Sequence, residues 1–344
     1  MNKGLASDNY AGVLPEMLEA IAEANKAHSK SYGHDAYTNR AKQTFASHFG
    51  EGVEVAFVFN GTGANVLGIG CVVQSFHAVL CADISHLFVD ESTAPETFTG
   101  CKFIPLPTNA EGKLEVTTIE KALIRKGDAH YAQIKVVSIA QPTEYGTVYS
   151  LDELTAIGAL LKKHGLVFHM DGARLFNAVA SLGCSIRAMT KDVGVDVLSV
   201  GGTKVGLLFG EAVVFFQATY ADVLPYKHKQ SMQLASKTRF IAAQFEALLE
   251  NKIWLRSTTH SNSMAQKLYL GIKDFTHIQI TKKVQANAVF AIMPPAWHDV
   301  LQKVLPFYIW NEQTYEVRLM CSFDTTEAEI DDFINAIAIL DKHK

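Results

Sequence analysis

The sequence has no long uninterrupted apolar run. A helix that crosses a bilayer needs about 20 consecutive apolar residues, and no stretch of that kind occurs among the 344 residues. The opening residues, MNKGLASDNYAG, also lack the apolar core of a secretory signal. We therefore expect no membrane partner and no signal peptide.

Cysteine and an excess of one charge are also lacking. The five cysteines are scattered, odd in number and without a Cys-x-x-Cys pair. This pattern argues against a disulfide framework and against a zinc site, and it favours the reducing cytoplasm. The 31 basic and 35 acidic side chains leave a formal charge of −4. That balance gives no electrostatic reason to expect a nucleic acid as partner.

What the sequence has instead is an alternation of short apolar runs with helical periods. At 150–164, Ser150 and Glu153 form a capping-box pattern, and Gly165 is placed to end the helix. Such alternation predicts an α/β fold with a mostly parallel sheet flanked by helices, because near-continuous apolar runs suit strands buried on both faces. The predicted strands lie at 54–59, 78–82, 134–140, 166–170, 195–200 and 212–216.

The pattern changes after about residue 225. A long helical stretch at about 231–272 precedes strand-like segments at 288–293 and 314–323, and Thr326 and Glu329 form a capping pair for a final helix. We predict an N-terminal segment, a large domain, and a linking helix with a smaller C-terminal α+β domain. Their predicted bounds are 1–30, 31–230 and 231–344.

The stretch FNGTGANVLG (59–68) follows a predicted strand and precedes a predicted helix. Glycines at 61 and 63 let backbone N–H groups approach an anion, and the start of a helix favours negative charge. The spacing matches neither the P-loop nor the usual dinucleotide-binding fingerprint. By itself the stretch predicts either a phosphate site or only a tight strand-to-helix turn.

Lys204 lies in a glycine-rich turn, LSVGGTKVGLLFG (198–210), after an apolar strand. Burial lowers the pKa of such an amine, and a neutral amine condenses with carbonyls. Asp171 ends an earlier apolar strand, LVFHM, so in a parallel sheet both residues can face one crevice. An aspartate there keeps the ring nitrogen of a pyridine cofactor charged. Taken singly, Lys204 is also typical of a solvated loop, and Asp171 of a helix N-cap.

Three further side chains suit the same chemistry. His86 can stack on an aromatic ring or act in acid–base catalysis, although surface histidines are common. Arg174 and Arg318 can each hold a carboxylate, with a cross-strand ion pair as the alternative for Arg318. Together with the glycine-rich turn, Asp171 and Lys204, these groups predict pyridoxal 5′-phosphate as cofactor and the fold-type I architecture that binds it.

Several segments resemble the low-specificity L-threonine aldolases, within the aromatic amino-acid β-eliminating lyase/threonine aldolase family. The resemblance covers about residue 6 to the end and implies a carbon–carbon lyase. Its reaction would be the reversible cleavage of a β-hydroxy-α-amino acid to glycine and an aldehyde. The segments that carry it are ASDNYAG, SYGHDAYTNRAKQTFASHFG, NGTGAN, SHLFVDE, HMDGARLFNA and VRLMCSFD.

The resemblance also implies a role for each matching residue. Lys204 would bind the cofactor covalently, Asp171 would pair with its ring nitrogen, and His86 would stack on its ring. Either His86 or a water held by Glu91 would take the β-hydroxyl proton. The remaining cofactor contacts would be Gly61, Thr62 and Gly63 on the phosphate, with Arg174 and Thr203 nearby. The substrate would contact Ser7, Tyr32, Glu144, Arg174 and Arg318.

Members of this family are dimers or tetramers, so the resemblance implies a homodimer or homotetramer with active sites at the subunit interface. Lys227, His228 and Lys229 could reach a neighbour's phosphate, or they could form a plain solvated basic patch.

The sequence departs from the family pattern at four places, and two of these bear on the substrate and on the base. Glu144 stands where better-known members carry a histidine, and KQSMQLASK (229–237) replaces a glycine-rich segment. Asn9 and Thr203 are smaller changes. A phenylserine-like amino acid is therefore a candidate substrate beside threonine and allo-threonine. Two rival functions would share the same cofactor groups: a β-eliminating lyase giving keto acid and ammonia, and a catalytically silent protein of this fold.

Overall fold

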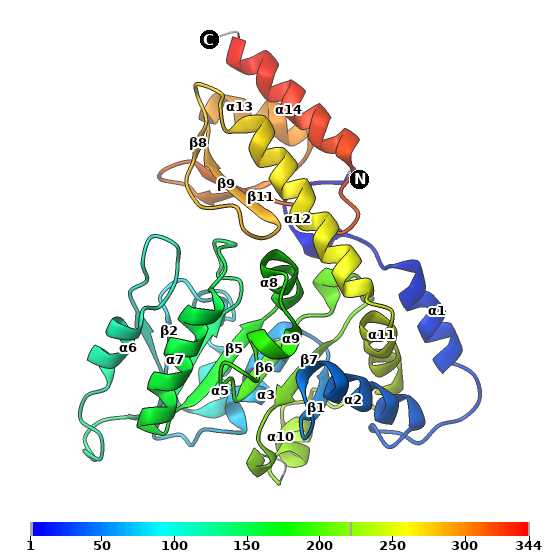
Figure 1. The fold of residues 1–344 in the computed structure, drawn as a ribbon, viewed down its shortest axis with the longest axis vertical. Helices are drawn as coiled ribbons and strands as arrows, with labels where there is room; N and C mark the ends of the chain where they lie inside the picture. The colour runs from blue at the N-terminus through cyan, green and yellow to red at the C-terminus, as the bar shows by residue number, and fades with distance from the viewer. Residues whose placement is uncertain (1–2, 221, 343–344) are drawn as a thin grey trace.

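The computed structural model describes residues 3–220 and 222–342. Two lobes stack on each other in Figure 1, a large one below and a small one above, and the yellow helix α12 (Ile253–Ile272) reaches from one to the other. Within the described residues, no helix is both long and apolar enough to cross a membrane.

A seven-stranded sheet forms the centre of the large lobe, in the order β1-β7-β6-β5-β4-β2-β3. Strands β2 to β6 run parallel, whereas β7 is antiparallel to both of its neighbours. The predicted mostly parallel sheet is confirmed. The strands are β1 (Glu54–Val58), β2 (His77–Ala82), β3 (Lys102–Leu106), β4 (Gln133–Ala140), β5 (Val167–Gly172), β6 (Val197–Val200) and β7 (Glu211–Phe215).

Strand β3 is the one strand of this sheet that the apolar pattern missed. It contains Pro105 and begins with the exposed Lys102. Proline removes a ladder hydrogen bond and is tolerated at a sheet edge, which is where β3 lies, paired with β2 alone. Its half-polar sequence therefore suits an edge and gives no continuous apolar signal.

Helices cover both faces of the large sheet (Figure 1). The Ser150–Glu153 capping box at the start of α7 is confirmed, and Gly165 ends that helix in the left-handed conformation at φ 69°. The helices are α1 (Pro15–Ala24), α2 (Ala36–Phe49), α3 (Gly61–Gly70), α4 (His86–Val89), α5 (Ala94–Thr99), α6 (Val116–Ala122), α7 (Leu151–His164), α8 (Leu175–Leu182), α9 (Ile186–Met189), α10 (Leu224–Gln230) and α11 (Arg239–Glu250), with the 3₁₀ turns η1 (Asp8–Tyr10), η2 (Thr203–Val205) and η3 (Ala218–Tyr220).

The small lobe has an antiparallel sheet in the order β10-β11-β9-β8. The final helix begins with the predicted capping pair, since Thr326 and Glu329 exchange backbone-to-side-chain hydrogen bonds of 2.8 and 3.3 Å. The elements after α12 are β8 (Gln279–Ile280), β9 (Ala288–Ile292), α13 (Pro295–Val304), β10 (Tyr308–Asn311), β11 (Glu316–Met320) and α14 (Glu327–Lys342).

Two expectations for this part were wrong. The single helical stretch at 231–272 is two helices, α11 and α12, separated where Lys252 takes the left-handed conformation at φ 50°. The break lets α11 pack against α2 in the large lobe while α12 continues to the small lobe. The strand predicted at 314–323 is shorter, and only β11 forms there. Strand β10, with the sequence YIWN before a polar turn, was not predicted.

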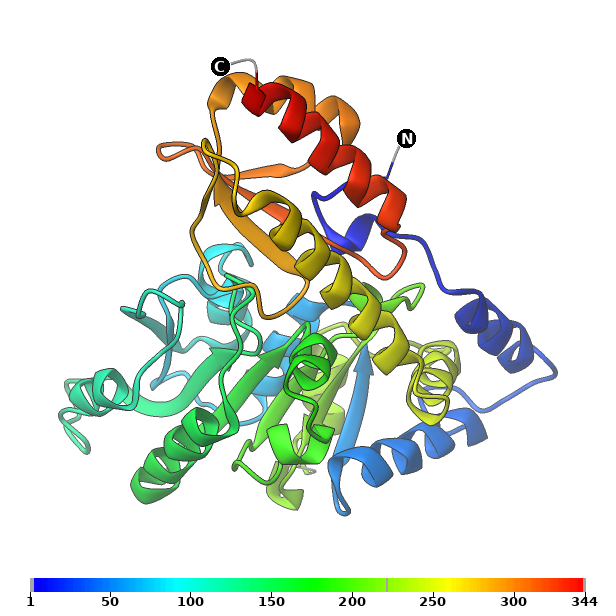
Figure 2. The same ribbon diagram turned by 45° about the horizontal axis from the view of Figure 1, so that its top comes forward.

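The N-terminal segment joins both lobes. Leu5 is fully buried in the core of the small lobe, and its N–H and C=O bond the backbone of Pro306 and Met320 at 2.7 Å each. The chain then turns through η1 and reaches α1, which packs against α11 of the large lobe. Figure 2 shows this blue segment starting beside the small sheet and leaving it for the large lobe.

Candidate active site

A cavity of about 370 Å³ opens where the carboxyl ends of the parallel strands β4 and β5 face the small lobe. Crevices at this end of a parallel sheet are the usual ligand sites of such folds, and this volume suits a small ligand. Asp171 and Lys204 both line it, so the two residues on which the predicted cofactor chemistry depends face one space. The other predicted residues that line it are Ser7, Gly61, His86, Glu91, Glu144, Arg174 and Arg318.

Asp171 is held by two hydrogen bonds. Its Oδ1 accepts from the Ala173 N–H and its Oδ2 from Nδ2 of Asn65, each at 2.9 Å. Asn65 also donates to Oε1 of Glu91 at 2.9 Å and accepts from Oγ of Ser199 at 2.8 Å. The buried amide therefore keeps both carboxylates in place. Sequence reasoning missed Asn65, although an asparagine in a helix whose other residues are small or apolar was a usable signal.

His86 lies between two acids. Its Nδ1 is 2.9 Å from Oε1 of Glu91, and its backbone N–H donates to Oε1 of Glu144 at 2.9 Å. The hydrogen bond with Glu91 is the main reason that the pKa of His86 is raised. Burial raises the pKa of Glu144 to about 7. An imidazole whose pKa is raised and a carboxyl whose pKa is brought to about 7 can move a proton at this wall of the cavity.

Lys204 has the lowered pKa that its sequence context predicted. Burial is the main cause and the positive charge of Arg174 the next, while Asp8, Asp171 and Glu211 act in the opposite direction. Less of the amine is protonated at neutral pH as a result, which favours attack on a carbonyl.

Packing shapes the turn that carries Lys204. A Cβ at Gly201 would lie 2.0 Å from the backbone oxygen of Ala173, so no other residue fits there without displacing the backbone. The Gly202 N–H donates to the side chain of Glu211, a buried acid that sequence reasoning missed. Burial raises the pKa of Glu211 to about 7.

The glycine-rich turn opens α3. Its Asn60 side chain caps the helix by accepting from the Gly63 N–H at 2.7 Å. Within the described residues, the N–H groups of Gly61 and Thr62 have no hydrogen-bond partner, and a Cβ on Gly61 would meet nothing within 4 Å. Two unpaired N–H donors at the start of a helix are an arrangement that can bind a phosphate.

Gly63 contacts a side chain from a distant segment. A Cβ there would lie 2.3 Å from Cδ of Gln233, whose Oε1 accepts from the Phe59 N–H at 3.0 Å. A Cβ at this position would therefore have to displace the Gln233 side chain, which comes from 229–237 and closes over the turn. Gln233 comes from the very segment in which the sequence departs from the family pattern.

The two arginines have different partners. Arg174 forms a bidentate pair with Asp8, with Nε and Nη2 at 2.6 and 2.8 Å from its carboxylate oxygens. Arg318 donates from Nη2 to the backbone oxygen of Ala6 at 3.2 Å. Among the described residues, its buried Nε has no partner. An unpaired buried guanidinium N–H beside a cavity is a ready donor for a ligand carboxylate.

Aromatic rings from β10 complete the wall beside Arg318. Its guanidinium carbon lies 4.9 Å from the ring centroid of Trp310 and 5.5 Å from that of Tyr308, and both rings line the cavity. Sequence reasoning missed both, because β10 itself was not predicted. Ser7 lines the cavity from the N-terminal segment, and its Oγ accepts from the Asn9 N–H at 3.2 Å.

Some predicted residues lie elsewhere. Tyr32 is not among the cavity-lining residues; its ring is 44% exposed and lies under Nζ of Lys229 at 4.8 Å. His228 is buried and bonds the backbone oxygen of Phe57 from Nε2 at 3.0 Å. Thr62, Gly63 and Thr203 adjoin lining residues without lining the cavity themselves.

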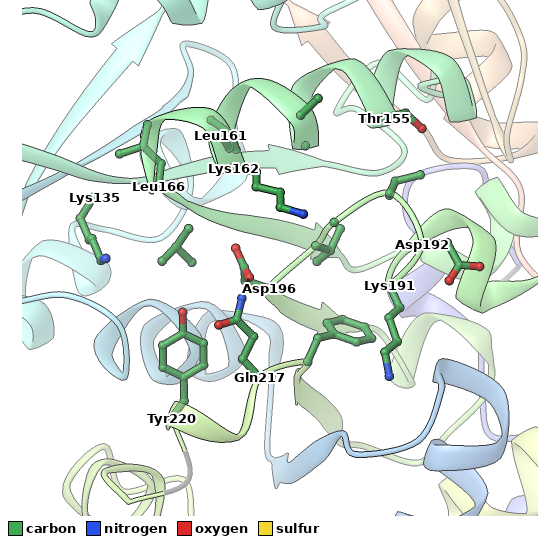
Figure 3. A pocket seen from close by; sticks show the side chains of 18 residues that line it. Lys135, Thr155, Leu161, Lys162, Leu166, Lys191, Asp192, Asp196, Gln217 and Tyr220 are labelled. Atoms are coloured by element: carbon green, nitrogen blue, oxygen red, sulfur yellow. Dashed lines mark hydrogen bonds between the residues drawn. The ribbon is translucent and has the colours of Figure 1, made fainter.

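A second and larger cavity, of about 680 Å³, lies at the opposite, amino ends of the parallel strands. Figure 3 shows its side chains, with Lys135, Lys162 and Lys191 spread around its rim and Asp196 pointing toward Gln217. No predicted cofactor residue reaches it. Its lysines are exposed or half-buried and lack the buried acid–amine arrangement of the first cavity.

Comparison with known proteins agrees with this geometry. A family model described as beta-eliminating lyase matches residues 4–294. The chain belongs to the beta-eliminating lyase family. Within the family it is 42% identical over 326 residues to a low specificity L-threonine aldolase of Pseudomonas sp., covering 94% of each chain. A protein of the same name from Pseudomonas aeruginosa is 42% identical over 321 residues, covering 93% of this chain and 92% of that one.

A solved structure described as a threonine aldolase of Leishmania major matches this member of the family over almost its whole length. The TM-score is 0.93 at 28% sequence identity, with 99% of this chain and 100% of that chain covered. The family and the fold class predicted from the resemblance are thereby confirmed.

Proposed function

We propose that this protein is a pyridoxal-phosphate-dependent carbon–carbon lyase that cleaves L-threonine and related β-hydroxy-α-amino acids reversibly to glycine and an aldehyde. The relatives named low specificity L-threonine aldolase support it at 42% identity over most of the chain. The observation that carries it is that Lys204 and Asp171 line one cavity together with two arginines.

The residues present fit the cofactor. Lys204 combines burial with a lowered pKa, as imine formation with an aldehyde requires. Asp171 is fixed by Asn65 and can face a ring nitrogen, and the free N–H groups of Gly61 and Thr62 suit a phosphate. When bound, pyridoxal phosphate supplies a conjugated ring that accepts the electron pair released as Cα–Cβ breaks.

The protein's own contribution to bond cleavage is orientation. Arg318 with its unpaired Nε, the free Nη1 side of Arg174 and Ser7 would hold the substrate carboxylate. A fixed carboxylate keeps the Cα–Cβ bond perpendicular to the ring, and orientation of this kind is worth several kcal/mol of barrier, about 7–11 kcal/mol at most. Tyr32 would join this site only if its ring turned toward the cavity.

The β-hydroxyl proton needs a base at the wall that His86 and Glu144 form. Glu91 is fully enclosed and bonds Nδ1 of His86, which supports a role in orienting the imidazole and leaving Nε2 for the proton. Glu144 is the second candidate, because burial brings its pKa to about 7. A carboxyl with a pKa near the working pH suits general base catalysis.

Product analysis tests the proposal against β-elimination. Purified protein loaded with pyridoxal phosphate should convert threonine to glycine and acetaldehyde, whereas β-elimination would give a keto acid and ammonia. Lys204→Ala should abolish the activity, and Lys162→Ala, a lysine at the other cavity, should not. Equal activity of the Lys204→Ala variant would contradict the proposal, as would keto acid as the main product.

Substrate range is a finer part of the proposal. Trp310 and Tyr308 line the cavity, which supports acceptance of a phenylserine-like substrate beside threonine and allo-threonine. Comparison of kcat/KM for threonine, allo-threonine and phenylserine tests this substrate range. A much lower kcat/KM for phenylserine would contradict it.

Assembly and location belong to the proposal too. Phe59 and Phe209 stack at 6.2 Å while 40% and 37% exposed, and Tyr226 and Met232 are 78% and 70% exposed. Such apolar side chains support a homodimer or homotetramer interface near α10. Light scattering of the wild type and of Phe209→Asp tests this. All five cysteines, which lie in the described part of the chain, are unpaired, which supports a cytoplasmic location.

A further inference from the structure

We propose that Asp8 is a positioning residue of the carboxylate site: it holds Arg174 beside Arg318 before the substrate arrives. This inference rests on the proposed function, because it takes the two arginines as the groups that bind the substrate carboxylate. Asp8 does not line the cavity and would not touch the substrate. Its effect would reach the substrate through the guanidinium that it holds.

The contacts of Asp8 leave one face of Arg174 available. The side chain of Asp8 is 1% exposed, and its two oxygens take the Nε and Nη2 hydrogens of Arg174. Within the described residues, Nη1 of Arg174 has no hydrogen-bond partner, yet it is not sealed from solvent, and the residue lines the cavity. The Arg174 guanidinium is thus held by Asp8 on its Nε–Nη2 edge and has its Nη1 side available for a ligand.

Charge gives a second reason for Asp8. Arg174 and Arg318 both face the cavity and carry like charges, so each opposes the ionised form of the other. Burial and then the charge of Arg174 lower the pKa of Arg318 to about 10, while Asp8 acts in the opposite direction. Without a ligand, the buried carboxylate supplies negative charge that favours the ionised form of both guanidinium groups.

The same aspartate also ties the site to the small lobe. Its Oδ2 accepts from Nδ2 of Asn287 at 3.2 Å, and Asn287 in turn donates to the backbone oxygen of Cys321 at 2.7 Å. Two residues earlier, Ala6 accepts from Arg318. Residues 6–8 therefore contact both arginines and both lobes. The distance between the two guanidinium groups thus depends on the position of this segment.

A site whose donors are already oriented binds its ligand more tightly, because ordering is not required at the moment of binding. Loss of the Asp8 charge should free Arg174 to turn away from Arg318. Binding of ligands with a carboxylate should weaken, and binding of ligands without one should not. A purely structural role for Asp8 would weaken both classes equally.

The experiment measures the affinity of the loaded protein for glycine and for glycinamide by calorimetry. Glycine has the carboxylate and glycinamide lacks it, so their affinity ratio reports the carboxylate site alone. We expect Asp8→Asn to weaken glycine binding by about tenfold or more, as loss of one hydrogen bond to a charged group predicts. Glycinamide binding should stay within about twofold.

Two further variants serve as controls. Tyr10→Phe removes the hydroxyl contact between Tyr10 and Tyr308 in the same segment and should leave the ratio unchanged. Asp8→Glu keeps the charge and should lower the ratio less than Asp8→Asn, which keeps the test usable if the asparagine variant folds poorly. Thermal melting of each variant identifies misfolding.

An unchanged ratio in both Asp8 variants would overturn the inference, and so would tighter glycine binding. Glycine has no Cα–Cβ bond to cleave, so this result is independent of whether threonine is split. A protein that binds glycine with the expected preference but leaves threonine intact would refute the proposed function and leave the role of Asp8 standing.

Discussion

Nδ1 of His86 and Oε1 of Glu91 lie 2.9 Å apart, although half of the His86 side chain is exposed and that of Glu91 is fully enclosed. The carboxylate of Glu91, which is shielded from solvent, therefore holds the His86 ring, which is accessible from the cavity. Asn65 gives Glu91 its second hydrogen bond and links it to Asp171. The proposed base and the proposed partner of the ring nitrogen thus share one network.

The first prediction concerns that pair. Glu91→Gln should lower the pKa of His86, because the hydrogen bond with the carboxylate is the main cause that raises it. If His86 takes the β-hydroxyl proton, the acid limb of the kcat/KM profile should move to lower pH in the variant. Nuclear magnetic resonance titration of His86 measures the pKa directly. An unmoved resonance would show that Glu91 does not act on the ring.

The second prediction separates Glu144 from His86 as the base. Burial raises the pKa of Glu144 to about 7, so the carboxylate form gains population as the pH rises through neutrality. If it is the base, Glu144→Gln should lower kcat by about 100-fold or more and remove the acid limb near pH 7. Glu120→Gln, at an exposed site, is the matched control. A limb that persists in Glu144→Gln assigns the proton transfer to another group.

The third prediction concerns the crowding at Gly63. Gly63→Ala should displace the Gln233 side chain, which lies 2.3 Å from the new Cβ, and break its bond to the Phe59 N–H. The loss should be about 1 kcal/mol of unfolding free energy. Gln233→Ala should cost a similar amount, and the double variant should cost little more than either single one. Chemical denaturation of the four proteins measures this, and additive losses would contradict it.

The fourth prediction gives a pH dependence of stability. Burial raises the pKa of Glu211 to about 7, above the ordinary glutamate value of 4.5. The folded state thus binds this proton more tightly than the unfolded state, and the stability it contributes below pH 4.5 is lost as the pH rises through 7.

Glu211→Gln keeps the acceptor for the Gly202 N–H but cannot ionise. Its unfolding free energy relative to the wild type should therefore increase between pH 5 and pH 8. Urea denaturation at the two pH values, with Glu120→Gln as control, measures the difference. A constant difference between wild type and Glu211→Gln would show that Glu211 ionises as freely in the folded protein as in the unfolded one.

Local patterns were sufficient to predict the fold class and to single out Asp171 and Lys204. Apolar runs mark strands that are buried on both faces, and the Ser150–Glu153 capping pair and Gly165 act within one helix, so neighbours in the chain specify them. Asp171 and Lys204 follow such strands directly. Their meeting in one cavity follows from the rule that the carboxyl ends of parallel strands share an edge.

Only packing between distant segments brings the remaining side chains to the site. Asp8 faces Arg174 because the first residues bond the small lobe, and Gln233 covers Gly63 because α10 returns the chain to the start of α3. Trp310 reaches Arg318 from β10, a short and mostly exposed edge strand that neighbours Arg318 only through its pairing with β11. Such contacts depend on tertiary distances rather than on residue periodicity, which is why no reading of neighbouring residues reveals them.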